Sequence, residues 1–125
     1  MAKRVDREGP IQRQIVAYLR AVLPGAIIHH SANESHLSGK RAMLATIRKK
    51  SDGMLPGFPD LIVMPDAVIG PFFLEVKAGK NDTTDAQKEV HTSLEALGYR
   101  VSVVRSVQDV RERLRSWSIP TRQRD

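Results

Sequence analysis

Two short motifs in the middle of the chain combine residue types that can bind a divalent cation and act on a phosphodiester. Gly57-Phe58-Pro59-Asp60 is followed, fifteen residues after its aspartate, by Glu75-Val76-Lys77. Mg²⁺ prefers oxygen ligands and usually takes one or two protein carboxylates together with water and substrate phosphate. Side chains alternate across a strand, so Lys77 would share a face with Glu75. It could then steer an attacking water or stabilise charge on the phosphate.

Two apolar runs would hold these motifs on neighbouring strands. Leu61-Ile62-Val63-Met64 follows Asp60 directly, and Phe72-Phe73-Leu74 leads into Glu75. The connection between them, residues 66–71, is short enough for a hairpin-like pair. Such a pair would bring Asp60 and Glu75 together.

The remaining periodicity predicts helices and strands around this pair. Apolar residues at helical spacing, from Ile11 to Leu23, indicate a first helix that ends at Pro24-Gly25. Residues 26–30 and 101–104 are typical of strands, residues 42–50 could form a short basic helix, and a capping box over 84–87 and a serine cap at 106 begin two further helices. We therefore expect an α/β domain over residues 1–117, with a central mixed sheet covered by helices, and a basic flexible tail over 118–125.

Composition limits the class of protein. The chain has 125 residues, 41% of them hydrophobic, which suits one globular domain with a real core. It has no cysteine, so disulfides and thiolate metal sites are excluded. Its first residues carry charges without an apolar stretch, and no run approaches a membrane span. We expect an intracellular protein without a signal peptide.

The net charge of +6 is distributed unevenly. Residues 51–99 hold eight acidic and three basic residues, whereas the rest holds seventeen basic and six acidic residues. An acidic centre with basic flanks suits an enzyme that gathers cations at carboxylates and grips a polyanion outside them. The basic residues cluster at Lys3, Arg4, Arg7 and Arg13; at Lys40, Arg41, Arg48, Lys49 and Lys50; and at Arg111, Arg113, Arg115, Arg122 and Arg124. Charges on ordinary solvated faces are the alternative.

The two motifs and their surroundings resemble the virus-type replication-repair nuclease (VRR-NUC) domain of the PD-(D/E)XK nuclease superfamily. The resemblance covers about residues 8–114. It rests on Asn33-Glu34, Gly57-Phe58-Pro59-Asp60-Leu61-Ile62, Phe73-Leu74-Glu75-Val76-Lys77, Gln87 with His91 and Leu94, and Gly98-Tyr99 before the last strand, with Glu8 and Gln12 at the opening helix. It implies a restriction-endonuclease-like αβββαβ core around a mixed four-stranded sheet.

The resemblance also implies the roles of site residues. Asp60, Glu75 and the Val76 carbonyl would bind Mg²⁺ or Mn²⁺, and Lys77 would be the catalytic lysine. Gln87 would be the glutamine that faces the site. Glu8 would supply an additional acid, with Glu34 as its competitor.

Small family members imply a homodimer that cuts branched DNA such as four-way junctions, in the cytoplasm of a bacterium or a phage-infected cell. The segment 37–56 is rich in lysine and arginine, which makes it a candidate loop for contact with DNA through Lys40, Arg41, Arg48, Lys49 and Lys50; a plain solvated connection is the alternative. Alternatives on the same core are a flap or single-strand nuclease, a restriction-like enzyme, or a binding module without catalysis. A basic RNA-binding protein would explain the arginines but not the two motifs.

Several site residues also have simpler interpretations. Asp60 could be a turn residue, and Glu75 with Lys77 a surface pair, if each stood alone. Gln87 could be only the partner of Thr84 in the capping box, and Glu8 only a helix-start acid. His91 lies one turn after Gln87 on the same helical face, so it could approach the substrate or be merely a satisfied histidine.

Overall fold

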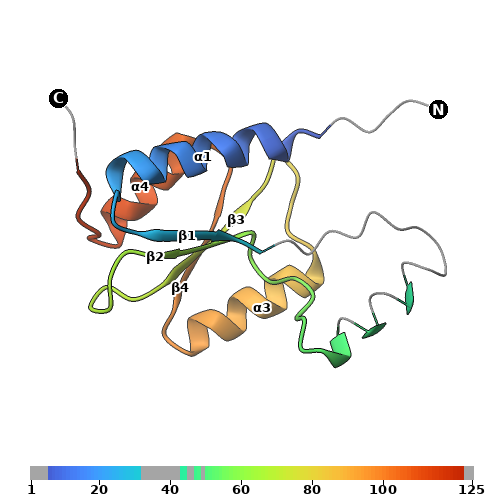
Figure 1. Cartoon of the computed structure of the whole chain (residues 1–125). Helices are drawn as coiled ribbons and strands as arrows, with labels where there is room; N and C mark the ends of the chain where they lie inside the picture. The colour runs from blue at the N-terminus through green and yellow to red at the C-terminus, as the bar shows by residue number, and fades with distance from the viewer. Residues whose placement is uncertain (1–5, 32–42, 45–46, 49, 123–125) are drawn as a thin grey trace.

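In the computed structural model of the chain, a four-stranded sheet lies between two layers of helices (Figure 1). The structure describes residues 6–31, 43–44, 47–48 and 50–122. Its elements are α1 (Glu8–Val22), β1 (Ile27–His30), β2 (Leu61–Met64), β3 (Phe72–Val76), α3 (Asp85–Ala96), β4 (Arg100–Val104) and α4 (Val107–Ser116). Helices α1 and α4 cover one face of the sheet and α3 covers the other. The predicted αβββαβ core is confirmed.

The sheet has the order β1-β2-β3-β4 and is mixed. Strand β2 pairs antiparallel with both β1 and β3, whereas β3 and β4 are parallel. Because Leu61 is opposite Leu74 in the β2–β3 register, the residue before Leu61 lies beside the end of β3. The hairpin-like pair predicted from the two apolar runs is therefore confirmed, and it places Asp60 at the same end of the sheet as Glu75.

Strand β3 is buried along its whole length and presents a different surface to each helical layer. Phe72, Leu74 and Val76 belong to the core that the sheet forms with α1 and α4. Phe73 lies on the opposite face with Phe58 and Tyr99, whose rings meet its ring edge to face at 5.6 and 5.8 Å. Glu75 shares this second face because strand side chains alternate. Burial on both faces thus places a carboxylate in the interior.

The remaining predictions about local structure have mixed outcomes. The described residues of the expected basic helix, 43–44, 47–48 and 50, are helical. Residues 118–122 of the expected tail instead pack against the helices: Ile119 is 5% exposed, and the Arg122 N–H donates to the Val22 carbonyl at 2.7 Å. Ile119 was missed because a single apolar residue among polar neighbours has no periodicity. In the described part of the chain, no helix is long and apolar enough to cross a membrane.

Candidate metal and catalytic site

Asp60 and Glu75 meet at the end of the β2–β3 pair. One Asp60 carboxylate oxygen, Oδ2, accepts a hydrogen bond of 2.7 Å from the Val76 N–H. The Asp60 and Glu75 side chains are also hydrogen-bonded to each other. Glu75 is 1% exposed and Asp60 is partly buried. The two carboxyl groups therefore form a fixed pair with little access to solvent.

The pair holds a proton that isolated carboxylates would release. The pKa of Asp60 is raised from 3.8 to about 7, first by burial and then by the hydrogen bond and the charge of Glu75. The pKa of Glu75 is also raised, chiefly by burial. Burial disfavours the charged form, and two adjacent carboxylates repel each other. A positive charge bound between the two groups would favour their charged forms and so oppose both shifts.

Lys77 supplies one positive charge at this place. It follows β3, its side chain is buried, and its N–H donates to the Val104 carbonyl at 3.0 Å, which extends the β3–β4 pairing. The charge of Lys77 lowers the pKa of both Asp60 and Glu75. The predicted grouping of Asp60, Glu75 and Lys77 is thus present in the fold.

Glu8 approaches the same place from α1. Its charge raises the pKa of Glu75, so the two carboxylates are within electrostatic range. The start of α1 is fixed by Asp6, whose carboxylate accepts a hydrogen bond of 2.9 Å from the Gly9 N–H. The competing acid Glu34 and its neighbour Asn33 lie outside the described residues. Glu8 as a metal ligand stays a prediction.

His91 also contacts the site, although the sequence assigned it no role as a ligand or catalytic residue. Its Nε2 lies 3.4 Å from Glu75 Oε1, and its side chain is nearly buried. Burial lowers the pKa of His91, which favours the neutral form of the ring facing Glu75. The histidine therefore contacts Glu75 from the α3 side. The sequence indicated a place for His91 near the site only through its position one turn after Gln87. The contact with Glu75 itself depends on how α3 packs on the sheet.

Gly57 brings the Asp60 turn against the start of α3. Its φ is +84°, a left-handed conformation that favours glycine. A Cβ placed on Gly57 would lie 2.5 Å from the Ala86 carbonyl and 2.7 Å from the Gln87 nitrogen. Both are backbone atoms and cannot rotate away. Glycine is needed here for conformation and for close approach.

Gly57→Ala is expected to destabilise the fold more than Gly70→Ala. Gly70 also has a positive φ, of +76°, but a Cβ there would meet nothing within 4 Å. Both variants carry backbone strain of about 1–3 kcal/mol, and Gly57→Ala adds the overlap with α3. Urea unfolding would measure the difference. Equal losses of unfolding free energy in the two variants would show that the contact with α3 is unimportant.

Gln87 forms the predicted capping box. Its N–H donates to Thr84 Oγ1 at 3.2 Å, and its side-chain oxygen accepts from the Thr84 N–H at 2.9 Å. Two N–H groups that the first turn of a helix leaves without partners are satisfied in this way. The box uses the side-chain oxygen of Gln87. A role of Gln87 in the site stays a prediction.

The structure brings some of the predicted residues together and leaves others untested. Within residues 6–31, 43–44, 47–48 and 50–122, no group of three or more histidine and acidic side chains is placed to hold a metal ion. The acidic part of the site is thus the Asp60–Glu75 pair. Of the predicted DNA-contacting residues, Arg48 and Lys50 are exposed. Lys40, Arg41 and Lys49 lie outside the described residues.

Comparisons with known proteins agree on one family. A family model described as the VRR-NUC domain matches residues 4–108. A solved structure named as a VRR-NUC domain protein is 22% identical to this chain, with a TM-score of 0.67, and the match covers 92% of this chain and 90% of that one. At this identity the structural likeness shows a shared fold. A search of curated proteins found no match.

Proposed function

Because the chain belongs to the VRR-NUC domain family, a family of nucleases, we propose that it is a metal-dependent endodeoxyribonuclease that hydrolyses phosphodiester bonds in branched DNA. The observation that supports this most is the buried pair of Asp60 and Glu75 with Lys77 beside it. A pair of interior carboxylates is costly to a fold unless a cation or proton neutralises it. A cation site accounts for keeping such a pair in the interior.

The residues present fit a divalent cation. Asp60 and Glu75 would hold Mg²⁺ or Mn²⁺, with the Val76 carbonyl as a further ligand and Glu8 as an additional acid. Two carboxylates suffice for Mg²⁺, which completes its shell with water and phosphate oxygens. When bound, the cation would polarise the scissile phosphate and lower the pKa of a coordinated water.

The protein's own groups prepare the site for this chemistry. The Val76 N–H orients the Asp60 carboxylate through its hydrogen bond, and His91 contacts Glu75 from α3. Lys77 would act on the attacking water or on a phosphate oxygen. As a clamp it would remain charged, whereas as a base it would have to lose its proton. Replacement by arginine distinguishes these two roles, as discussed below.

Branched DNA and a homodimer are the finer parts of the proposal. The basic flanks of the sequence support a polyanionic substrate, and symmetric cutting of a four-way junction is matched most simply by a two-fold dimer. The test is cleavage of labelled four-way junction, flap, single-stranded and linear duplex DNA, together with sedimentation of the protein. Preferred cutting of the junction by a dimer would support the proposal. Preferred cutting of flaps, single strands or a linear sequence would assign one of the alternatives on this core.

Gln87→Glu is expected to reduce cleavage without loss of stability. Glutamate can also serve as the third helical residue of a capping box, so the unfolding free energy should remain within about 0.5 kcal/mol of the wild type. The substitution would place a negative charge where the glutamine is proposed to face the cation and the DNA. Thr84→Ala is the control, because it should cost about 1 kcal/mol of stability and leave cleavage unchanged. If Gln87→Glu cuts DNA as fast as the wild type, Gln87 serves the cap alone.

A further inference from the structure

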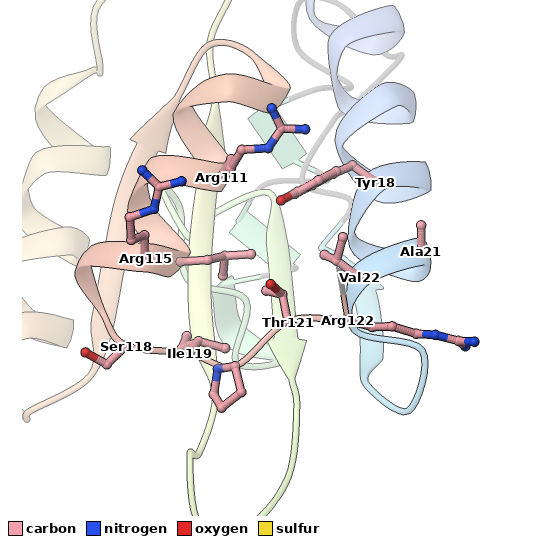
Figure 2. A pocket seen from close by; sticks show the side chains of 11 residues that line it. Tyr18, Ala21, Val22, Arg111, Arg115, Ser118, Ile119, Thr121 and Arg122 are labelled. Carbon is pink, nitrogen blue, oxygen red and sulfur yellow. The ribbon is translucent and has the colours of Figure 1, made fainter. Parts of the chain in front are cut away.

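A groove lies between α1, α4 and residues 118–122, separate from the carboxylate pair (Figure 2). Its volume is about 730 Å³. Tyr18 reaches across it from α1 towards Arg111 on α4, with Arg115 farther along α4 and Arg122 on the opposite rim. Tyr18 is ten residues beyond Glu8 in the same helix, which corresponds to roughly 15 Å along the helix axis. This separation from Glu8 is on the order of half a duplex turn.

The lining of the groove carries positive charge without acidic residues. Arg111, Arg115 and Arg122 are among its lining residues, and none of the lining residues is acidic. In the described part of the chain, no carboxylate lies within the 4.0 Å of an ion pair from these three arginines. Arg111 instead lies over the Tyr18 ring at 5.3 Å and donates to Gln108 Oε1 at 3.1 Å. Arginines without acidic partners leave the groove suited to an anion.

Helix α4 separates its charges between two faces. Arg111 and Arg115, four residues apart, line the groove. Asp109, Glu112 and Arg113 line a second, smaller depression beside β4. The acidic residues of this helix are thus kept away from the groove, although they are close in sequence. Because the acidic side chains of α4 line the other depression, the surface of the groove itself is basic.

The groove is held in shape by the core. Ser118 has a φ of +56° and turns the chain after α4, and Ile119 then inserts into the core with 5% exposure. The Arg122 N–H donates to the Val22 carbonyl at the end of α1. One wall of the groove is therefore anchored at both ends, so a ligand would not have to order it. Preorganised sites lose less free energy on binding.

We propose that this groove binds the sugar-phosphate backbone of the DNA arm that flanks the cleaved bond. The proposal rests on the proposed nuclease function. Guanidinium groups match phosphate geometry and make charge-assisted hydrogen bonds to it. Arginines on both rims of an open groove fit an extended polyanion, which passes between them. Contacts of this kind position the DNA and carry no direct sequence information.

The test compares Arg115→Gln/Arg122→Gln with Arg113→Gln. Arg113 is on the same helix but faces the second depression, so it controls for lost positive charge near α4. Binding is measured with Ca²⁺ in place of Mg²⁺ over a range of salt concentrations, on junction DNA with long arms. The double variant should bind about tenfold more weakly, and the slope of affinity against salt should fall by about 2, as expected for two lost phosphate contacts. Arg113→Gln should bind like the wild type.

Arm length provides the second measurement. Junctions with one arm too short to reach the groove should be bound equally by the double variant and the wild type. With Mg²⁺, the two proteins should also cut these junctions at equal rates. Thermal unfolding confirms that the variants are folded. The proposal would be overturned if Arg113→Gln weakened DNA binding as much as the double variant does, or if the effect of the double variant did not depend on arm length. It would also be overturned if the double variant changed the sedimentation of the protein and left its DNA affinity unchanged. The last outcome would assign the groove to a second copy of the chain. If the wild type neither binds nor cuts DNA, the proposed nuclease function and the groove proposal both fail. If the wild type does both and the variants match it, only the groove proposal fails.

Discussion

Lys77→Ala should cut DNA at least a hundredfold more slowly than the wild type while binding the same DNA. Lys77 is buried beside the carboxylate pair, and its charge lowers the pKa of both acids. A positioned proton-transfer group contributes about 10²–10⁴ to a rate, and a positioned charge contributes about 10²–10³. Single-turnover cleavage measures the rate, and DNA affinity is measured separately with Ca²⁺. Removal of an exposed lysine, Lys80→Ala, is the matched control and should cut at the wild-type rate.

Lys77→Arg distinguishes the two roles of the lysine. Arginine keeps a positive charge but does not lose its proton under ordinary conditions. If Lys77 is an electrostatic clamp, arginine should restore a substantial part of the rate lost in Lys77→Ala. If Lys77 is a base, arginine should cut as slowly as alanine. Wild-type rates in Lys77→Ala would contradict both roles and remove Lys77 from the site.

Asp60→Asn should abolish the stabilisation of the protein by Mg²⁺ or Mn²⁺ and should be more stable than the metal-free wild type at pH 8. Asparagine resembles the protonated aspartate, because it can still accept from the Val76 N–H and donate to Glu75. It lacks the charge that would bind a cation. Calorimetric titration with Mn²⁺ and thermal unfolding at several pH values would measure the two effects.

The direction of the pH effect follows from the raised pKa of Asp60. Between its ordinary value of 3.8 and the folded value of about 7, the folded protein holds a proton that the unfolded chain has released. Unfolding free energy therefore falls as pH rises through this window. For a partly exposed group, we expect a loss of about 2 kcal/mol from pH 5 to pH 8 in the metal-free wild type. Asp60→Asn should lose less unfolding free energy over the same pH range. Added cation should restore the unfolding free energy of the wild type at pH 8 but should have no such effect at pH 5.

Asp66→Asn is the control for this substitution. Asp66 lies in the exposed turn after β2, where it accepts a hydrogen bond from the Ile69 N–H, and asparagine can keep that bond. Its pH dependence and its response to cations should match those of the wild type. If the metal-free wild type is as stable at pH 8 as at pH 5, the Asp60–Glu75 pair does not hold a proton in the way described.

Local sequence signals predicted most of the fold because they depend on near neighbours. The apolar runs at 61–64 and 72–74 marked β2 and β3, and the short connection between them required an antiparallel pair. Thr84 and Gln87 marked the start of α3 through a capping box that the structure contains. The grouping of Asp60, Glu75 and Lys77 followed from two such strands and from the alternation of side chains.

Features that depend on packing between distant segments could not be predicted in the same way. His91 contacts Glu75 only because α3 crosses the face of β3 that carries this glutamate. Gly57 is required by the backbone of α3, which lies about thirty residues later in the chain. Ile119 enters the core from a segment whose composition is typical of a tail. No short window of sequence contains both partners of any of these contacts.

Cleavage of a labelled four-way junction before and after restoring a divalent cation is the decisive measurement for the proposed site. Wild-type protein and Asp60→Asn are freed of metal with EDTA, and single-turnover rates are then measured with EDTA, Mg²⁺ or Mn²⁺. We predict that the wild type cuts only after a cation is added and that Asp60→Asn does not cut under any condition. Cutting by the wild type in EDTA, or equal cutting by Asp60→Asn with Mg²⁺, would contradict a catalytic metal site at Asp60 and Glu75.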